Sequence, residues 1–215
     1  MTSYSSLDMN NWSLRLWCKN NRTAVYFTEG EKAPVVKLYE RGETNKVLYS
    51  ITREEGSGHV SAVVNLTPNQ LETLTKIDEW VLTQTSKNSR EWFGKTLTRQ
   101  ELSLIYSSPI RNESLRVKVS LEGKRASDIT ILEDDGPQTG SGWGFLSKYL
   151  DEEGGRGALG RLFITPSIWI MGKNKFGLTW TVTHVALTQA PRQVRKNPFL
   201  EDDDDTLTLM AQLAA

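Results

Sequence analysis

Residues 166–187 read PSIWIMGKNKFGLTWTVTHVAL and predict a β-hairpin. Apolar runs flank the central segment 172–177, GKNKFG, whose glycines and asparagine are typical of a turn. After this turn, Leu178, Trp180 and Val182 alternate with threonines, so these three side chains should point into the core. The hairpin is the strongest indication that the chain forms a β-structure.

Short strand-like segments also fill the first third of the chain, about ten residues apart. Such spacing is typical of strands that curl into a barrel or a sandwich. The strands expected over the whole chain are 12–17, 24–28, 34–39, 46–52, 59–66, 115–121, 129–132, 162–171 and 178–187. In the segment 115–121, apolar residues alternate with Arg116 and Lys118, which should therefore face solvent. The predicted fold class is mainly β with inserted helices.

Two helices are expected as an insertion around residues 67–106. Thr67 and Gln70 form a capping box, with a proline at the first helical position. Apolar residues then recur at helical spacing, and polar residues predict the end of the helix near Thr85. A weaker helical pattern covers residues 98–106.

Residues 136–160 contain eight glycines and predict a long loop, interrupted by residues 143–150. Long loops in compact domains are usually functional or disordered. Gly155, Gly157 and Gly160 spell the G-x-G-x-x-G pattern. A dinucleotide site needs a strand before this pattern and a helix after it, whereas here acidic residues precede it and a strand follows. A flexible loop is therefore the favoured interpretation.

The charge of the chain is unevenly distributed. The 215 residues include 26 basic and 26 acidic ones, so the formal net charge is zero. Five acidic residues are consecutive: Glu201, Asp202, Asp203, Asp204 and Asp205. Without them the chain has 26 basic and 21 acidic residues, a net charge of +5. We therefore expect one mildly basic domain over residues 1–190 and a disordered acidic tail over residues 191–215.

Several classes of protein are disfavoured by composition. A single cysteine excludes an intramolecular disulfide framework and a thiolate metal cluster, and the two distant histidines argue against a histidine metal site. No apolar run is long enough to cross a membrane, and the N-terminus lacks the pattern of a secretory signal. The expectation is a protein of the host-cell cytoplasm or nucleus, not secreted, without cofactors or metals.

Catalytic motifs are also missing from the sequence. It contains no G-x-S-x-G, P-loop or H-E-x-x-H motif. Acidic clusters at 133–135 and 151–153 could hold Mg²⁺, but solvated turns explain them better because no third spaced carboxylate or histidine accompanies them. We expect no enzyme, and keep as one alternative a metal-dependent nuclease using Glu133, Asp134 and Asp135.

Aromatic and basic residues interleave in the hairpin. Trp169 and Phe176 lie close to Lys173 and Lys175. Proteins that bind single-stranded nucleic acid need cations along the phosphates and flat side chains for the exposed bases. Most aromatic residues could instead fill the core, which is the interpretation favoured for Trp180. A second alternative is therefore a viral structural or interaction β-protein that binds no nucleic acid.

The segment 166–187 resembles the C-terminal strand pair of single-stranded-DNA-binding proteins encoded by tailed phages and large DNA viruses. In those families a strand bearing tryptophan or tyrosine runs into a Gly/Lys turn, and an aromatic–glycine pair begins the strand that closes an OB-fold. The order of strands, inserted helix, Gly-rich loop and acidic tail is also similar. One departure is the C-terminus, where Ala214 and Ala215 stand in place of an aromatic residue.

The resemblance implies an OB-fold-like barrel that coats single-stranded DNA during viral or phage replication, recombination or repair, without sequence specificity. The DNA-binding residues it suggests are Trp169, Phe176, Tyr26 and Trp143 for stacking, and Lys173, Lys175, Arg116, Lys118, Arg161 and Arg156 for phosphates. The residues 201–205 of the tail would mask the groove or recruit polymerase and helicase. Because Tyr26 and Phe27 are adjacent in a strand, only one of them should face outward. A homo-oligomer is compatible with this function, and a membrane partner is not expected.

Overall fold

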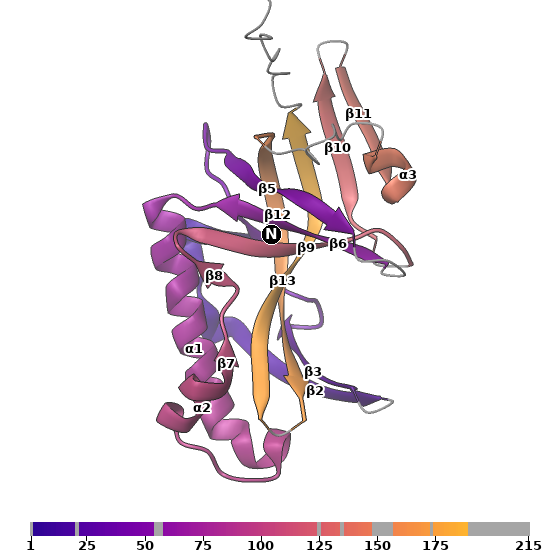
Figure 1. Cartoon of the computed structure of the whole chain (residues 1–215). Coiled ribbons are helices and arrows are strands. Elements are labelled where there is room, and N and C mark those ends of the chain that lie inside the picture. The colour runs from indigo at the N-terminus through magenta and orange to yellow at the C-terminus, as the bar shows by residue number, and fades with distance from the viewer. Residues whose placement is uncertain are drawn as a thin grey trace, which may run out of the picture.

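The predicted C-terminal hairpin is present and lies at the centre of the sheet. The computed structural model describes residues 2–19, 22–53, 58–123, 126–133, 136–147, 157–172 and 174–188. Strands β12 (Leu159–Met171) and β13 (Lys175–Thr188) pair antiparallel along their whole length (Figure 1). A register shift between Phe163 and Ile164 marks a bulge. The two halves of the hairpin join different parts of the sheet.

The half of the hairpin that lies away from its turn, which we call the upper half, forms a closed ring of pairings with three other strands. β5 (Asn45–Arg53) pairs with β6 (His59–Asn65), which pairs with β9 (Ser114–Ser120). β9 runs parallel to β13, and β12 returns to β5. This last pairing joins only residues 159–160 to residues 45–46, so the ring is not a regular barrel. The mainly β class with inserted helices is confirmed.

The lower half of the hairpin carries a smaller sheet, which we call the arm. β3 (Arg22–Glu29) pairs with β12, and β2 (Trp12–Lys19) pairs with β3. β7 (Tyr106–Ser107) pairs with β13 on the other side of the hairpin. The remaining short elements are β1 (Thr2–Ser3), β4 (Val36–Lys37), β8 (Ile110–Arg111), β10 (Asp128–Glu133), β11 (Gly136–Ser141) and the 3₁₀ turns η1 (Tyr4–Ser6) and η2 (Met9–Asn11).

Helix α1 (Pro68–Phe93) covers one face of the arm (Figure 1). The predicted capping box at Thr67 is confirmed, as is helix α2 (Arg99–Ile105), which follows its own capping box at Thr98. The predicted end of α1 at Thr85 is wrong, because the helix continues to Phe93.

The extra turns of α1 are stabilised by tertiary contacts. The buried hydroxyl of Ser89 donates to the Ser86 carbonyl at 2.9 Å and accepts from the Leu97 amide at 3.0 Å. Trp92 is buried in the core, and Gly94 ends the helix with a left-handed φ of 71°. A polar run that looks like a helix end in sequence is therefore retained in the helix by partners outside it.

The glycine-rich segment after β10 is not the continuous loop that we predicted. Residues 136–141 form β11, an antiparallel partner of β10, and α3 (Trp143–Leu146) follows. β11 has no apolar alternation because most of its side chains are exposed. Its pairing depends on the backbone ladder with β10 and on one hydrogen bond of 3.1 Å between the hydroxyls of Thr130 and Thr139. Gly140 is required here, since a Cβ atom would lie 2.5 Å from the ring of Phe145.

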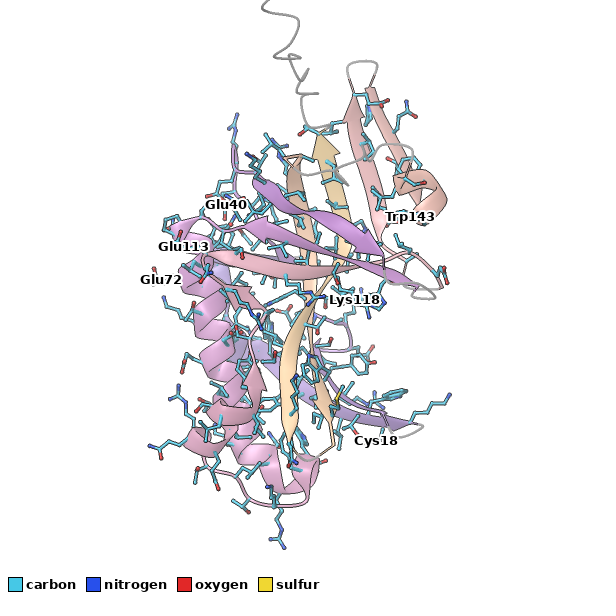
Figure 2. The ribbon with its side chains drawn as sticks, viewed as in Figure 1. Cys18, Glu40, Glu72, Glu113, Lys118 and Trp143 are labelled. Atoms are coloured by element: carbon cyan, nitrogen blue, oxygen red, sulfur yellow. The ribbon has the colours of Figure 1, made fainter. Side chains whose placement is uncertain are left out.

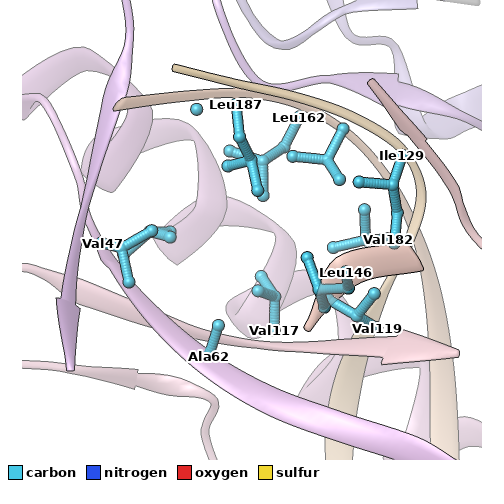
Figure 3. A pocket seen from close by; sticks show the side chains of 12 residues that line it. Val47, Ala62, Val117, Val119, Ile129, Leu146, Leu162, Val182 and Leu187 are labelled. Carbon is cyan, nitrogen blue, oxygen red and sulfur yellow. The ribbon is translucent and has the colours of Figure 1, made fainter. Parts of the chain in front are cut away.

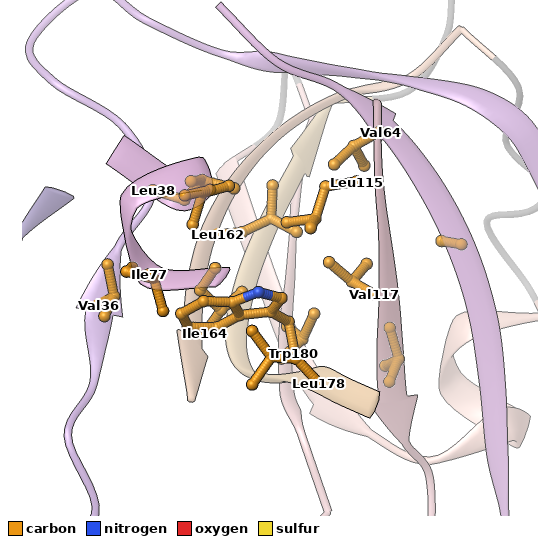
Figure 4. Close-up of a cluster of buried hydrophobic side chains, with 14 of the residues drawn as sticks. Val36, Leu38, Val64, Ile77, Leu115, Val117, Leu162, Ile164, Leu178 and Trp180 are labelled. Carbon is orange, nitrogen blue, oxygen red and sulfur yellow. The ribbon is translucent and has the colours of Figure 1, made fainter. Parts of the chain in front are cut away.

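The core fills the ring and the space between the arm and α1. Trp180 is fully buried, as predicted, among Ile77, Leu162 and Ile164 (Figure 4). Its indole nitrogen has no hydrogen-bond partner within the described part of the chain. Inside the ring, a cavity of about 20 Å³ has an entirely apolar lining, to which Leu146 of α3 contributes (Figure 3). This size leaves room for about one water molecule, and the apolar lining offers it no partner.

A buried carboxylate joins α1 to the strand that follows α2. Asp78 accepts hydrogen bonds from the hydroxyls of Tyr106 at 2.9 Å and Ser108 at 2.5 Å. Burial raises the pKa of Asp78 above its ordinary value, although these two hydrogen bonds act in the opposite direction. The folded protein therefore holds this proton more tightly than the unfolded chain does.

This burial predicts a pH-dependent contribution to stability. The contribution of Asp78 should be complete below the ordinary aspartate pKa and should decline as pH rises through the raised pKa. We expect the free energy of unfolding of the wild type, minus that of Asp78→Asn, to fall as pH rises above the ordinary aspartate pKa of about 4, measured by urea titrations at several pH values. In the control Glu72→Gln no such fall is expected, because the hydrogen bond and charge of Lys76 lower the pKa of Glu72. A difference that stays flat or rises for Asp78→Asn would contradict the prediction.

Candidate nucleic-acid interface

The face of the arm opposite α1 gathers aromatic and basic side chains from three strands. Tyr26 is paired in register with Arg15 of β2 and with Ser167 of β12. One row further, Trp17 and Trp169 flank Ala24. Paired residues point to the same side of a sheet, so these side chains share one surface. We call this surface the arm face: Arg15, Trp17, Tyr26, Ser167 and Trp169.

The burial pattern agrees with this assignment. Phe27 is fully buried and its ring lies 5.8 Å from that of Trp80 on α1, whereas its neighbour Tyr26 is half-buried on the arm face. Trp17 is 41% exposed and packs edge-to-face on Tyr26, with ring centroids 6.3 Å apart. The alternation of β2 and β3 thus decides which of the adjacent aromatics faces outward, as the sequence predicted in general terms.

Trp169 packs against the backbone of the neighbouring strand. It pairs with Gly177 of β13, and a Cβ atom at that position would lie 2.7 Å from the indole ring. The same Cβ atom would lie 2.5 Å from the Ser107 carbonyl of β7. A glycine is therefore needed for Trp169 to lie so close to β13, where it remains half-buried.

Two predicted cations extend the arm face beyond the hairpin. Lys118 of β9 is paired with Thr181 of β13 and with Ser61 of β6, and Arg116 is exposed two residues earlier on the same strand. The guanidinium of Arg116 donates to the Ser61 hydroxyl at 3.3 Å. Figure 2 shows Lys118 where β9 crosses the hairpin. The structure therefore brings Tyr26, Trp169 and the two β9 cations to neighbouring rows of one sheet.

The predicted stacking role of Phe176 is wrong. Phe176 is fully buried, with its ring 5.6 Å from that of Phe93 and 5.1 Å from that of Tyr106. It lies on β13 in phase with Leu178 and Trp180, which the sequence already placed in the core. Counting this alternation back to residue 176 would have identified Phe176 as a core residue.

The other predicted contacts are scattered or lie outside the described residues. Lys175 is exposed beside Met171 at the tip of the hairpin. Trp143 lies on α3 beside β11, at the other end of the molecule from β2 (Figure 2). Arg161 lies on the upper half of β12, 5.8 Å from the ring of Tyr39. Lys173, Arg156 and the tail residues 201–205 lie outside the described residues.

Sequence reasoning missed Arg15 and Trp17 as part of this face. The signal was present, because both alternate with the apolar residues Leu14 and Leu16 and so had to point away from the core. Only the pairing of β2 with β3 shows that they neighbour Tyr26.

The described residues show no other candidate chemistry. Within them, no three histidine, cysteine or carboxylate side chains gather as a metal site, and Asp134 and Asp135 of the alternative nuclease centre lie outside them. None of the helices described is long and apolar enough to cross a membrane.

Comparisons with known proteins give one family match and a set of structural neighbours. Residues 54–130 match the model of a family described as "Family of unknown function (DUF5871)". No curated protein matches the sequence. The single-stranded DNA-binding protein from bacteriophage Enc34 is 13% identical, with a TM-score of 0.46 over 86% of this chain and 95% of that chain.

Two further neighbours are of the same kind. The Enc34 protein in complex with single-stranded DNA is 13% identical, with a TM-score of 0.44 over 84% of this chain and 97% of that chain. The single-stranded DNA-binding protein gp2.5 of bacteriophage T7 is 9% identical, with a TM-score of 0.41 over 86% of this chain and 97% of that chain. The structural neighbours are thus phage single-stranded DNA-binding proteins at low identity, and no residue role is transferred from them.

Proposed function

We propose that this protein binds single-stranded DNA without sequence specificity and without catalysing a reaction. The observation that carries the proposal is the arm face, where Trp17, Tyr26 and Trp169 lie in rows next to those of Arg116 and Lys118. The support is this arrangement rather than the likeness to the phage proteins, whose TM-scores are below 0.5.

The chemistry of the arm face suits unpaired bases. An exposed base can stack on an indole or phenol ring, and every base has a flat face, so stacking is tolerant of sequence. In a duplex the base faces are already stacked on one another, so the aromatic rings would find no partner there. The cations of β9 would lie along the phosphates, whose charge makes binding depend on salt.

We assign the five-strand ring to an OB-fold-like barrel, within a single binding domain over residues 1–190. The support is the pairing order β12–β5–β6–β9–β13, in which the β9–β13 pair is parallel and the others are antiparallel. OB-folds are partly open five-stranded barrels that commonly bind oligonucleotides. The barrel would hold the β9 cations and the arm face in one rigid body.

The proposed setting is viral or phage DNA replication, recombination or repair. The resemblance of the hairpin sequence to virus-encoded proteins supports this setting. In this setting the acidic residues 201–205 would compete with DNA for the basic face or recruit replication proteins such as polymerase and helicase, because they carry the charge of a phosphate backbone.

The salt dependence of binding tests the proposal. The variant Arg116→Gln/Lys118→Gln should bind oligo-dT of about 30 nucleotides more weakly, with the slope of log K against log salt reduced by about 0.7 for each lost contact. The loss should be similar for oligo-dT and mixed sequences, since phosphates are the same in both. Fluorescence anisotropy at several salt concentrations measures both quantities.

A matched control removes a cation elsewhere. Arg99→Gln changes a residue on α2 that pairs with Glu79 of α1, away from β9, and should leave the slope unchanged. If the wild type binds no oligo-dT at low salt, or binds duplex equally well, the single-strand proposal is wrong. The alternative of a structural β-protein would then be favoured.

A further inference from the structure

A second aromatic and basic cluster lies on the upper half of β12. We call it the upper cluster: Lys37, Tyr39, Arg161, Phe163 and His184. The ring of Phe163 is edge-to-face with that of Tyr39 at 5.6 Å and with that of His184 at 5.9 Å. The Lys37 ammonium lies 4.6 Å from the centroid of the Tyr39 ring, and the Arg161 guanidinium lies 5.8 Å from it.

Strand alternation points these side chains outward. Val36 and Leu38 are fully buried, so Lys37 and Tyr39 face away from the core. The same holds on β12, where Leu162 and Ile164 are buried and the residues on either side of them are not. The cluster is therefore a surface feature of the ring and not part of its packing.

The two clusters share one side of β12. Phe163, Thr165, Ser167 and Trp169 alternate with buried residues, so all four project from the same face of the strand. At about 3.3 Å per residue, Phe163 and Trp169 are about 20 Å apart along the strand. At the duplex rise of about 3.4 Å per nucleotide this span corresponds to about six nucleotides, within the range of about 4–16 for one OB-fold.

The surface between the clusters is lined by small hydroxyl residues. Thr165 pairs with Thr181, and Ser167 pairs with Thr179, so the floor consists of four hydroxyl side chains, two across and two along the strands. No bulky or acidic side chain of β12 or β13 rises from these rows. The Thr165 hydroxyl already donates to the Pro34 carbonyl at 2.8 Å, so a polynucleotide backbone that crosses this floor would find its hydrogen-bond donors at Ser167, Thr179 and Thr181. A row of large apolar residues would instead exclude the backbone.

The acidic groups near the upper cluster already have hydrogen-bond or ion-pair partners. The Asp128 carboxylate pairs with His184 at 3.0 Å, and Glu40, near Lys37, accepts hydrogen bonds from the hydroxyls of Ser3 and Ser5. In the described part of the chain, Arg161 has no carboxylate within ion-pair distance. The exposed Arg161 is therefore available for a phosphate.

We propose that the upper cluster is a second base-stacking subsite for the same DNA strand that occupies the arm face. The strand runs along β12, with bases stacked at Trp169 and Tyr26 at one end and at Phe163 and Tyr39 at the other. Its backbone crosses the hydroxyl floor, and Arg161 and Lys37 contact phosphates at the far end. This inference rests on the proposed single-strand binding and adds the path and length of the bound strand.

The length dependence of binding tests this path. Wild-type affinity should rise steeply between oligo-dT of about 4 and about 12 nucleotides, because only the longer one spans both subsites. The variant Tyr39→Leu/Phe163→Leu should bind the longer oligonucleotide about 5- to 100-fold more weakly, while affinity for the shorter one at the arm face changes by less than about twofold. Equal affinity of variant and wild type for the longer oligonucleotide would overturn the proposal.

A second variant tests the same path with a substitution that should not disturb folding. Arg161→Gln changes an exposed side chain, so it should fold normally and should lower the salt slope by about 0.7 for the longer oligonucleotide only. Arg99→Gln again serves as the control cation. An unchanged slope in Arg161→Gln would count against the path. If the wild type binds neither oligonucleotide, the proposed single-strand binding is wrong. If the wild type binds both, and these variants match it in affinity and salt slope, only the proposed path along β12 is wrong.

Discussion

Replacing Tyr26 and Trp169 together by leucine is expected to weaken binding of single-stranded DNA by about 2–6 kcal/mol, at least about 30-fold. Each ring would lose a stacked base, which is worth about 1–3 kcal/mol. Both side chains are half-buried on the arm face, opposite the side packed on α1, so leucine leaves the core intact. The effect should be independent of salt, in contrast to that of the β9 cations, because stacking releases no counterions.

The measurement is fluorescence anisotropy with labelled oligo-dT of about 30 nucleotides at two salt concentrations, with duplex as a comparison. Trp143→Leu is the matched control, because Trp143 is also a half-buried tryptophan but lies on α3 away from the arm face. It should bind like the wild type. If the Tyr26→Leu/Trp169→Leu variant binds within about twofold of the wild type and remains folded, the arm face is not the stacking surface.

Replacing Trp180 by alanine is expected to lower the free energy of unfolding by about 3–5 kcal/mol, the largest loss of stability that we predict for one residue. Trp180 is fully buried where β13 meets both β9 and β12, so alanine would leave a cavity between the ring, the arm and α1. Trp180→Phe should cost clearly less. Phenylalanine keeps most of the ring volume, and among the described residues the indole N–H has no partner that its loss would leave unpaired.

Urea unfolding followed by far-ultraviolet circular dichroism measures these changes. The control is Leu104→Ala on α2, since Leu104 is 85% exposed and its truncation should change stability by less than about 0.5 kcal/mol. A Trp180→Ala variant within about 1 kcal/mol of the wild type would contradict the central packing position of this residue. An equal loss in the alanine and phenylalanine variants would contradict the smaller cost expected for phenylalanine.

Local sequence signals determined the elements of this fold. Alternation in 115–121 separated the buried face of β9 from Arg116 and Lys118, and alternation in 178–182 placed Trp180 in the core. The capping box at Thr67 marked the start of α1, and a weaker helical pattern from residue 98 indicated α2. These features are readable because side-chain period and cap chemistry involve residues that are close in sequence.

Tertiary contacts decided the rest. The last turns of α1 depend on Leu97 and on packing by Trp92, and β11 depends on backbone pairing with β10, so neither has a periodic pattern of its own. Likewise, Tyr26 and Trp169 become neighbours only because β3 pairs with β12, more than a hundred residues later in the chain. By itself the sequence determined which side meets water in strands with a clear alternation, such as β9 and the middle of β13. Only the tertiary structure decided which of those sides join into one surface, because strand pairing is a long-range choice that local periodicity does not encode.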